Sequence, residues 1–211
     1  HKHNTNMPIT LYKRQKQILD FLKQYIDKYT YSPTLAEIAD SIGVSSLATV
    51  HEHLQALVQK GVIKRFDGAV RGIEVVDQKI SDTLKGIELP VLGFIAAGQP
   101  IMAYTDPDAT IKVSPSMVSG KKRSYVLQVK GDSMIEDGIL AGDHVIIEEH
   151  SVANNGDIVV ALLDNGLATL KRFFREPNRI RLEPANSTMQ PIYATEVKIQ
   201  GKCVGVIRRF A

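Results

Sequence analysis

The chain changes its hydrophobic pattern once, at a polar stretch that runs from Asp77 to Gly86. Before this stretch apolar residues recur every three to four positions, which indicates helices, whereas after it short β-rich segments alternate with turn residues. A chain of 211 residues is long enough for two domains with separate cores. We therefore predict a multidomain α+β fold with an expression-tag remnant over residues 1–6, a helical domain over 7–76, a linker over 77–86 and an all-β domain over 87–211.

Three helices are expected in the first domain. The apolar residues between Tyr12 and Tyr29 share one helical face. A second helix follows Thr34, which forms a capping box with Glu37 three residues later, and it ends at Gly43, where a left-handed residue is favourable. After a short turn a third helix is expected over residues 45–60.

A β-hairpin is predicted directly after the third helix, with strands over residues 62–66 and 69–75 joined by the dipeptide Asp67-Gly68. Three helices followed by such a hairpin are typical of a winged helix-turn-helix, which binds double-stranded DNA. A winged helix that contacts proteins instead is the alternative. The candidate DNA contacts are Ser45, Ser46, Ala48, Thr49, His51 and Glu52 for base edges, and Lys64, Arg65 and Arg71 for phosphates.

The charge distribution agrees with a polyanionic partner for the first domain. The first 76 residues contain 10 Lys and Arg residues against 7 Asp and Glu residues, whereas the rest of the chain contains 16 of each. The positive excess therefore lies in the region with the helix-turn-helix pattern. Because the positive excess is small, an ordinary solvated surface explains this charge distribution nearly as well as a polyanionic partner does.

The second domain shows eight β-rich segments separated by turn signals such as Asn165-Gly166. This pattern predicts a single all-β domain. The expected strands are Leu89 to Ile95, Ile111 to Val113, Tyr125 to Lys130, His144 to Glu148, Asp157 to Leu163, Leu167 to Phe174, Arg179 to Pro184 and Lys198 to Arg209.

A lysine stands in an unusual place within the strand from Leu167 to Phe174. Both faces of this strand are largely apolar, so one of the two adjacent cations, Lys171 or Arg172, is expected to point inward. A buried lysine tends to lose its proton and can then act as a general base for a serine such as that in Gly131-Asp132-Ser133-Met134. Taken alone, Gly131-Asp132-Ser133 is more typical of an ordinary turn, and a strand lysine is more typical of the surface.

The composition argues against disulfide-stabilised, metal-binding and membrane proteins. The single cysteine excludes an internal disulfide, and His51 and His53 cannot share a helix face, so no metal site or cofactor is predicted. No apolar run approaches the roughly 18 residues needed to span a bilayer. With no leader pattern either, we expect a cytoplasmic protein without a membrane partner.

The order of these segments resembles the LexA repressor family of the bacterial DNA-damage (SOS) response, whose second domain is similar to signal peptidases. The resemblance extends from Met7 to Phe210. In the first domain it depends on Ser32-Pro33-Thr34, Glu37-Ile38-Ala39, Glu52-His53-Leu54, Leu57, Lys60-Gly61 and Arg71-Gly72-Ile73. In the second it depends on Ala96-Ala97-Gly98, Gly131-Asp132-Ser133-Met134, Gly142-Asp143, Lys171-Arg172, Pro184-Ala185-Asn186-Ser187 and Val204-Gly205-Val206-Ile207.

The resemblance implies a serine peptidase that cleaves its own chain and thereby ends repression. Ser133 would attack the peptide bond between Ala97 and Gly98, and uncharged Lys171 would take the serine proton and return it to the leaving amine. Because the substrate is tethered, even a slow dyad suffices.

Further groups and partners follow from the same resemblance. Thr169 shares the strand face of Lys171 and would orient the amine, while backbone N–H groups near Asp132 and Ser133 would hold the oxyanion. A RecA filament on single-stranded DNA would favour cleavage. A homodimer formed through the terminal strand, residues 204–208, would bind both halves of a near-palindromic operator.

Three alternatives stay open at this level: a phage-type repressor with the same peptidase domain, a Ser/Lys peptidase acting in trans such as a signal peptidase, and a repressor whose β domain is an inert ligand sensor. The hairpin and the motif Arg71-Gly72-Ile73 favour an SOS repressor over a phage-type repressor. One departure concerns the third helix, where better-known members have an asparagine and a glutamate in place of Ala48 and His51. The resemblance therefore implies the function but not the operator sequence.

Overall fold

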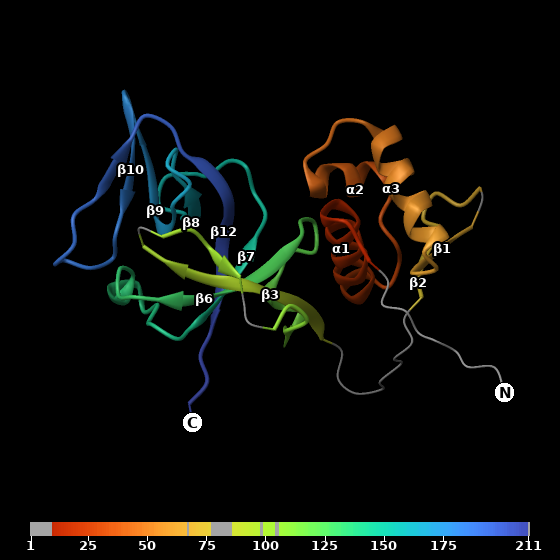
Figure 1. Ribbon diagram of the computed structural model, residues 1–211, viewed down its shortest axis with the longest axis horizontal. Helices are drawn as coiled ribbons and strands as arrows, with labels where there is room; N and C mark the ends of the chain where they lie inside the picture. The colour runs from red at the N-terminus through yellow and green to blue at the C-terminus, as the bar shows by residue number, and fades with distance from the viewer. Residues whose placement is uncertain (1–9, 67, 77–85, 98, 104–105, 211) are drawn as a thin grey trace. The chain divides into compact units, whose positions relative to one another are not determined.

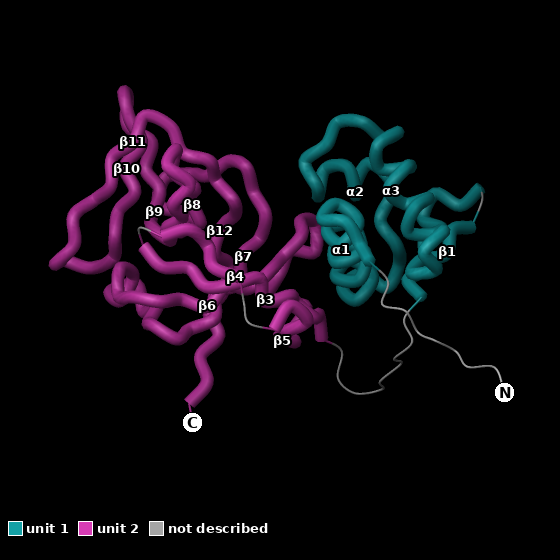
Figure 2. The backbone as a smooth tube through the Cα atoms, in the orientation of Figure 1, with its two compact units in different colours: residues 1–85 teal, residues 86–211 magenta. Residues whose placement is uncertain are grey.

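The computed structural model describes residues 10–66, 68–76, 86–97, 99–103 and 106–210 (Figure 1). These residues form two compact units, one within residues 1–85 and the other within residues 86–211 (Figure 2). The predicted tag remnant, Asp67, nearly all of the predicted linker and Gly98 lie outside the described residues. The predicted fold class, a helical domain followed by an all-β domain, is confirmed.

The first unit contains the three predicted helices, α1 (Lys13–Tyr29), α2 (Leu35–Ile42) and α3 (Leu47–Gln59). The predicted capping box is present at α2, since the Thr34 hydroxyl accepts from the Glu37 N–H at 3.2 Å and the Glu37 carboxylate accepts from the Thr34 N–H at 2.7 Å. Gly43 ends this helix in the left-handed conformation (φ +69°). The sharp turn that separates α2 from α3 is therefore encoded locally.

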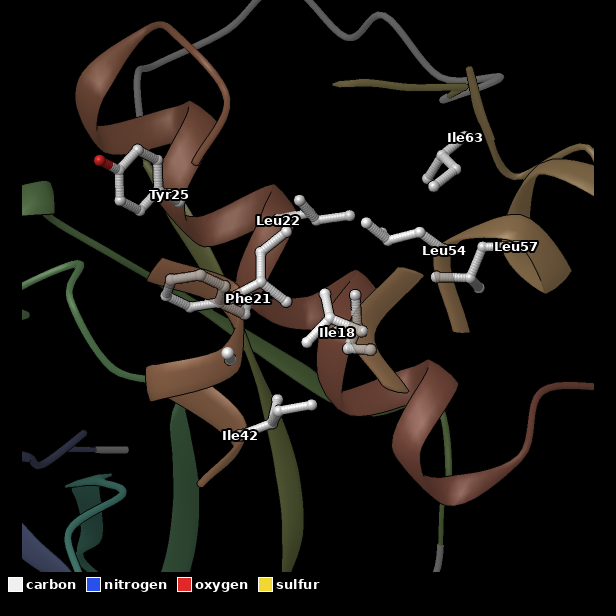
Figure 3. Packing of buried hydrophobic residues seen from close by; sticks show 11 residues of the cluster. Ile18, Phe21, Leu22, Tyr25, Ile42, Leu54, Leu57 and Ile63 are labelled. Carbon is white, nitrogen blue, oxygen red and sulfur yellow. The ribbon is translucent and has the colours of Figure 1, made fainter. Parts of the chain in front are cut away.

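The core of this unit lies between the three helices and the first strand of the hairpin (Figure 3). Ile18, Phe21 and Leu22 of α1 meet Leu54 and Leu57 of α3, and all five side chains are fully buried. The i, i+3 and i, i+4 spacing of these residues places them on one face of each helix. The opposite face of α3 stays in solvent.

The hairpin differs from its prediction. Its strands are only β1 (Ile63–Arg65) and β2 (Ile73–Val75), and Arg65 opposite Ile73 is the last pair. The predicted strands, over residues 62–66 and 69–75, are therefore too long. A turn at the predicted dipeptide is supported on either side of Asp67, which itself lies outside the described residues: the Ala69 N–H donates to the Phe66 carbonyl at 3.4 Å, and Gly68 has a positive φ (+79°). The Phe66 N–H also donates to the Gly72 carbonyl at 2.8 Å.

The second unit contains all eight predicted strands within a mixed, mainly antiparallel sheet, and it adds the short strands β4 and β11. The strand order is β11-β10-β9-β8-β12-β7-β6-β3-β4, and β5 pairs with β3. Among the strands that the structure describes, only β3 and β6 pair in parallel. The bounds are β3 (Ile87–Ala96), β4 (Met102–Ala103), β5 (Thr110–Val113), β6 (Ser124–Lys130), β7 (His144–Glu148), β8 (Ile158–Leu162), β9 (Ala168–Glu176), β10 (Arg179–Glu183), β11 (Ile192–Ala194) and β12 (Lys198–Ile207).

Strand β12 changes its partner along its length. Its first half pairs with β8 as far as Lys202, and from Lys202 to Ile207 it pairs with β7. Two bulges, between Ile199 and Gly201 and between Cys203 and Gly205, accompany this change. Among the described strands, the second half of β12 consequently has a partner on one side only.

Candidate active site

The β8–β9 hairpin brings the predicted base into the interior. Leu162 opposite Ala168 is its last pair, and Gly166 adopts a positive φ (+80°) in the turn, as the Asn165-Gly166 dipeptide predicts. Of the two adjacent cations on β9, Lys171 is the inward one, with 2% of its surface exposed.

The Lys171 amine lies 2.8 Å from the Ser133 Oγ. It also lies 2.8 Å from the Thr169 Oγ1 and 3.0 Å from the Leu170 carbonyl oxygen. These four groups come from two segments 38 residues apart in sequence, and the fold brings the predicted nucleophile, base and supporting hydroxyl together. Each of the three partners of the amine is a neutral oxygen.

This environment changes the proton affinity of the amine. Burial lowers the pKa of Lys171 to about 8, because the charged form loses its hydration. A neutral amine has two N–H donors and one lone pair. The Leu170 carbonyl and Thr169 hydroxyl can accept both N–H groups, which leaves the lone pair for the Ser133 hydroxyl proton.

The segment that carries Ser133 leads into a 3-10 turn, η2 (Ile135–Asp137), which is held from two sides. Arg172, the outward neighbour of Lys171, pairs with the Asp137 carboxylate at 2.8 Å. Asn186, in the loop between β10 and β11, donates from its Nδ2 to the Asp132 carbonyl at 2.9 Å. No local pattern predicted these two contacts, although Asn186 lies within one of the motifs that carry the family resemblance.

The predicted cleavage segment follows β3, which ends at Ala96. Ala97 is exposed in the turn after this strand, whereas Gly98 lies outside the described residues. The Gln99 N–H donates to the Ala96 carbonyl at 3.3 Å, and the Gln99 carbonyl accepts from the Ala168 N–H at 3.0 Å. The chain on both sides of the predicted bond therefore lies beside β9, the strand that carries Lys171.

In the first unit, the predicted DNA contacts of α3 lie around the start of the helix. The Ser46 side chain caps the helix by accepting from the Thr49 N–H at 3.3 Å, so it already has a structural role. Thr49 is half-buried, and the remaining candidates on this helix are exposed. They are Ser45, Ala48, His51 and Glu52. On the hairpin, Lys64 is exposed and Arg65 is half-buried.

Arg71 is bound within its own unit. Its guanidinium makes two hydrogen bonds of 3.0 and 3.1 Å to the Glu37 carboxylate and one of 2.9 Å to the Ser32 carbonyl, and it lies over the Tyr31 ring. Burial alone would raise the pKa of Glu37, but the hydrogen bonds from Arg71, Thr34 and Tyr25 lower it to about 2. The phosphate contact for Arg71 stays a prediction, whereas its contact with α2 is a feature of the fold.

Comparison with known proteins agrees with this two-part arrangement. A family model for the LexA DNA binding domain matches residues 9–72, and one described as Peptidase S24-like matches residues 90–204. The LexA repressor of Geobacillus kaustophilus is 42% identical over 203 residues, covering 95% of this chain and 98% of that protein. The chain belongs to the LexA repressor family.

Other members of the family are equally similar over their whole length. The LexA repressor of Caldicellulosiruptor saccharolyticus is 45% identical, with 94% of this chain and 98% of that protein covered. That of Syntrophomonas wolfei is 44% identical, with 97% and 99% covered. Membership in the LexA family makes the chain a DNA-binding repressor with a peptidase domain, and it favours this class over a signal peptidase.

Two further findings concern the described part of this LexA family member. None of its helices is both long enough and apolar enough to cross a membrane. Its described residues also contain no group of three or more His, Cys, Asp or Glu side chains that could hold a metal ion.

Proposed function

We propose that this chain is a repressor of the SOS regulon that inactivates itself by cutting the Ala97–Gly98 bond with a Ser133/Lys171 dyad. The observation that carries the proposal is the 2.8 Å distance between a serine hydroxyl and a buried lysine amine whose pKa lies at about 8. Such an amine is largely neutral in mildly alkaline solution and can accept the serine proton.

The chemistry needs no other component than water. Lys171 takes the Ser133 proton while the Oγ forms a bond to the Ala97 carbonyl carbon, and a backbone N–H of the Ser133 segment binds the resulting oxyanion. The C–N bond then breaks, and the protonated Lys171 gives its proton to the amine of Gly98. Water finally hydrolyses the Ala97 ester and frees Ser133. Thr169 supports these steps by holding one N–H of the amine.

The described backbone supports intramolecular presentation of the substrate. Residues on both sides of the bond are tied to one another and to β9 by the Gln99 hydrogen bonds. A tethered bond has a high effective concentration, so a dyad without a third residue suffices. Binding of a RecA filament on single-stranded DNA would favour the conformation in which the bond reaches Ser133.

Repression itself is proposed to require a homodimer on operator DNA. The second half of β12 offers an edge that no described strand covers, and Val204 (44% exposed) and Val206 (38% exposed) lie along it. An uncovered edge with apolar side chains is suited to pairing with a second copy. Two linked α3 helices then read two half-sites, while Lys64 and Arg65 contact phosphates. Cutting the chain after Ala97 separates the DNA-binding unit from the dimer.

Alkaline self-cleavage tests the proposal. Purified protein is incubated between pH 6 and 10 and the fragments are resolved by gel electrophoresis and mass spectrometry. We expect the rate to rise about tenfold per pH unit below pH 8 and to level off above it, because the neutral fraction of Lys171 rises in this way. Ser133→Ala and Lys171→Ala should remain whole. Cleavage of Ser133→Ala at the parent rate would refute the dyad.

A further inference from the structure

Asn186 is a buried polar residue that contacts the nucleophile segment from outside the dyad. Only 9% of its surface is exposed. Its Oδ1 accepts from the Thr188 N–H at 3.0 Å and from the Thr188 hydroxyl at 2.7 Å, while its Nδ2 donates to the Asp132 carbonyl at 2.9 Å. Because the Thr188 backbone N–H can only donate, it fixes which end of the amide faces Thr188. The amide nitrogen must therefore face Asp132.

The Asp132 carbonyl belongs to the same peptide unit as the Ser133 N–H. A trans peptide is planar, so its carbonyl and its N–H point in opposite directions. The described residues contain no cis peptide bond. Holding the Asp132 oxygen consequently holds the direction of the Ser133 N–H. Within the described part of the chain, no group accepts a hydrogen bond from this N–H.

We propose that Asn186 is a positioning residue that locks the Asp132–Ser133 peptide unit and thereby aims the Ser133 N–H at the oxyanion. This inference rests on the proposed self-cleavage through Ser133. Oxyanion donors act by being fixed before charge develops, so a peptide unit that can rotate stabilises the tetrahedral intermediate less well. From the described residues, the Asp132 oxygen receives one other hydrogen bond, from the Ile135 N–H at 3.4 Å, which is too long to fix the peptide unit alone.

The same two loops are joined by a second set of contacts that does not involve the Asp132–Ser133 peptide. The Glu136 N–H donates to the Ala185 carbonyl at 2.8 Å, and the Glu136 carboxylate accepts from the Ser187 N–H at 2.7 Å. Removing the Glu136 side chain therefore weakens the docking of the loops but leaves the Asn186 amide on its carbonyl. Glu136→Ala is the matched control for Asn186→Ala.

The test measures self-cleavage of the full chain against pH for both variants. Complete loss of one oxyanion donor reduces a rate by about 100-fold or more. For Asn186→Ala, in which the donor is present but free to rotate, we expect a fall of about 10- to 100-fold in the rate above pH 8. The midpoint of the profile should stay at the parent value, because Lys171 keeps its partners. Glu136→Ala should change the rate by less than about threefold.

A second readout separates positioning of the donor from docking of the cleavage segment. Labelling of Ser133 by a fluorophosphonate places a phosphonyl oxygen where the oxyanion would form, and it does not require the Ala97–Gly98 bond to reach the serine. Labelling of Asn186→Ala should fall together with self-cleavage. Unchanged labelling, or an equal loss in Glu136→Ala, would overturn the role of Asn186.

Two controls keep the outcomes distinct. If Asn186→Ala lowers the melting temperature of the second unit, Thr188→Val gives the milder test, since it keeps the amide but removes one of its two anchors. A parent-like rate in Thr188→Val together with a parent-like rate in Asn186→Ala refutes the inference. Cleavage that persists in Ser133→Ala refutes the proposed function itself, whatever Asn186 does.

Discussion

Arg71 in the first unit and Lys171 in the second are both cations held by hydrogen bonds, but with opposite chemical consequences. Arg71 meets a carboxylate, a backbone carbonyl and an aromatic ring, and it remains about a third exposed. Lys171 meets three neutral oxygens and is almost completely buried. The carboxylate pairs with the permanent charge of the guanidinium and makes it a structural link, whereas burial without a counter-charge favours the neutral form of the lysine amine. The partners of a cation, more than its position in a strand or loop, decide whether it can act as a base.

Replacing the base by a cation that cannot lose its proton is the most severe test of this contrast. Arg is charged at every accessible pH, so Lys171→Arg cannot take the Ser133 proton. We expect self-cleavage to fall by about 10³-fold or more at all pH values, the upper range for removal of a general base. The measurement is the fraction of intact chain after incubation at pH 7 to 10. A variant that still cleaves with a midpoint near pH 8 would show that another group is the base.

The cost of burying Lys171 should be measurable as stability. Its pKa is about 8 in the folded chain against an ordinary value of 10.5, so at pH 7 the folded state bears the full cost of the buried charge. Between pH 8 and 10.5 the unfolded state binds more protons, and the free energy of unfolding therefore rises with pH. Above pH 10.5 the cost has disappeared.

Lys171→Met in the uncleavable Ser133→Ala background isolates this effect. At pH 7 the methionine should raise the free energy of unfolding of the second unit by roughly 3 kcal/mol, since one pKa unit corresponds to about 1.4 kcal/mol. The difference from the Ser133→Ala parent should vanish by about pH 11. Urea unfolding at both pH values measures it. A difference that does not change with pH would mean that Lys171 has the same pKa in the folded and the unfolded chain, so that burial does not lower it.

The contrast between the two cations also shows how far the sequence could predict the molecule. The eight predicted strands and the three predicted helices follow from local periodicity, and the apolar faces of β9 indicated that either Lys171 or Arg172 points inward. What local patterns could not predict are contacts between distant segments. Glu37 and Arg71 are 34 residues apart. Asn186 and Asp132 are 54 apart, so no local pattern connects them.

The smallest expected effect is on the salt dependence of DNA binding, and it distinguishes cations of the first unit that contact DNA from those that stabilise its fold. Lys64 is exposed on β1 with its charge toward solvent, so it is suited to a phosphate, whereas Arg71 is held by Glu37. Each phosphate contact adds about 0.9 to the slope of log K against log salt. We expect Lys64→Ala to reduce this slope by about one, and Arg71→Gln to leave it unchanged while lowering the melting temperature of the unit.

Glu37→Gln separates the two roles of Arg71 further. Without the carboxylate the guanidinium loses its ion pair but keeps its charge, so a structural role predicts the same loss of stability as in Arg71→Gln. Binding to operator and to unrelated DNA between 50 and 300 mM salt, together with thermal unfolding, measures both effects. If Arg71→Gln reduces the slope by as much as Lys64→Ala, the arginine contacts phosphate. Arg71 would then have a functional role as well as a structural one, and the contrast with Lys171 would not hold.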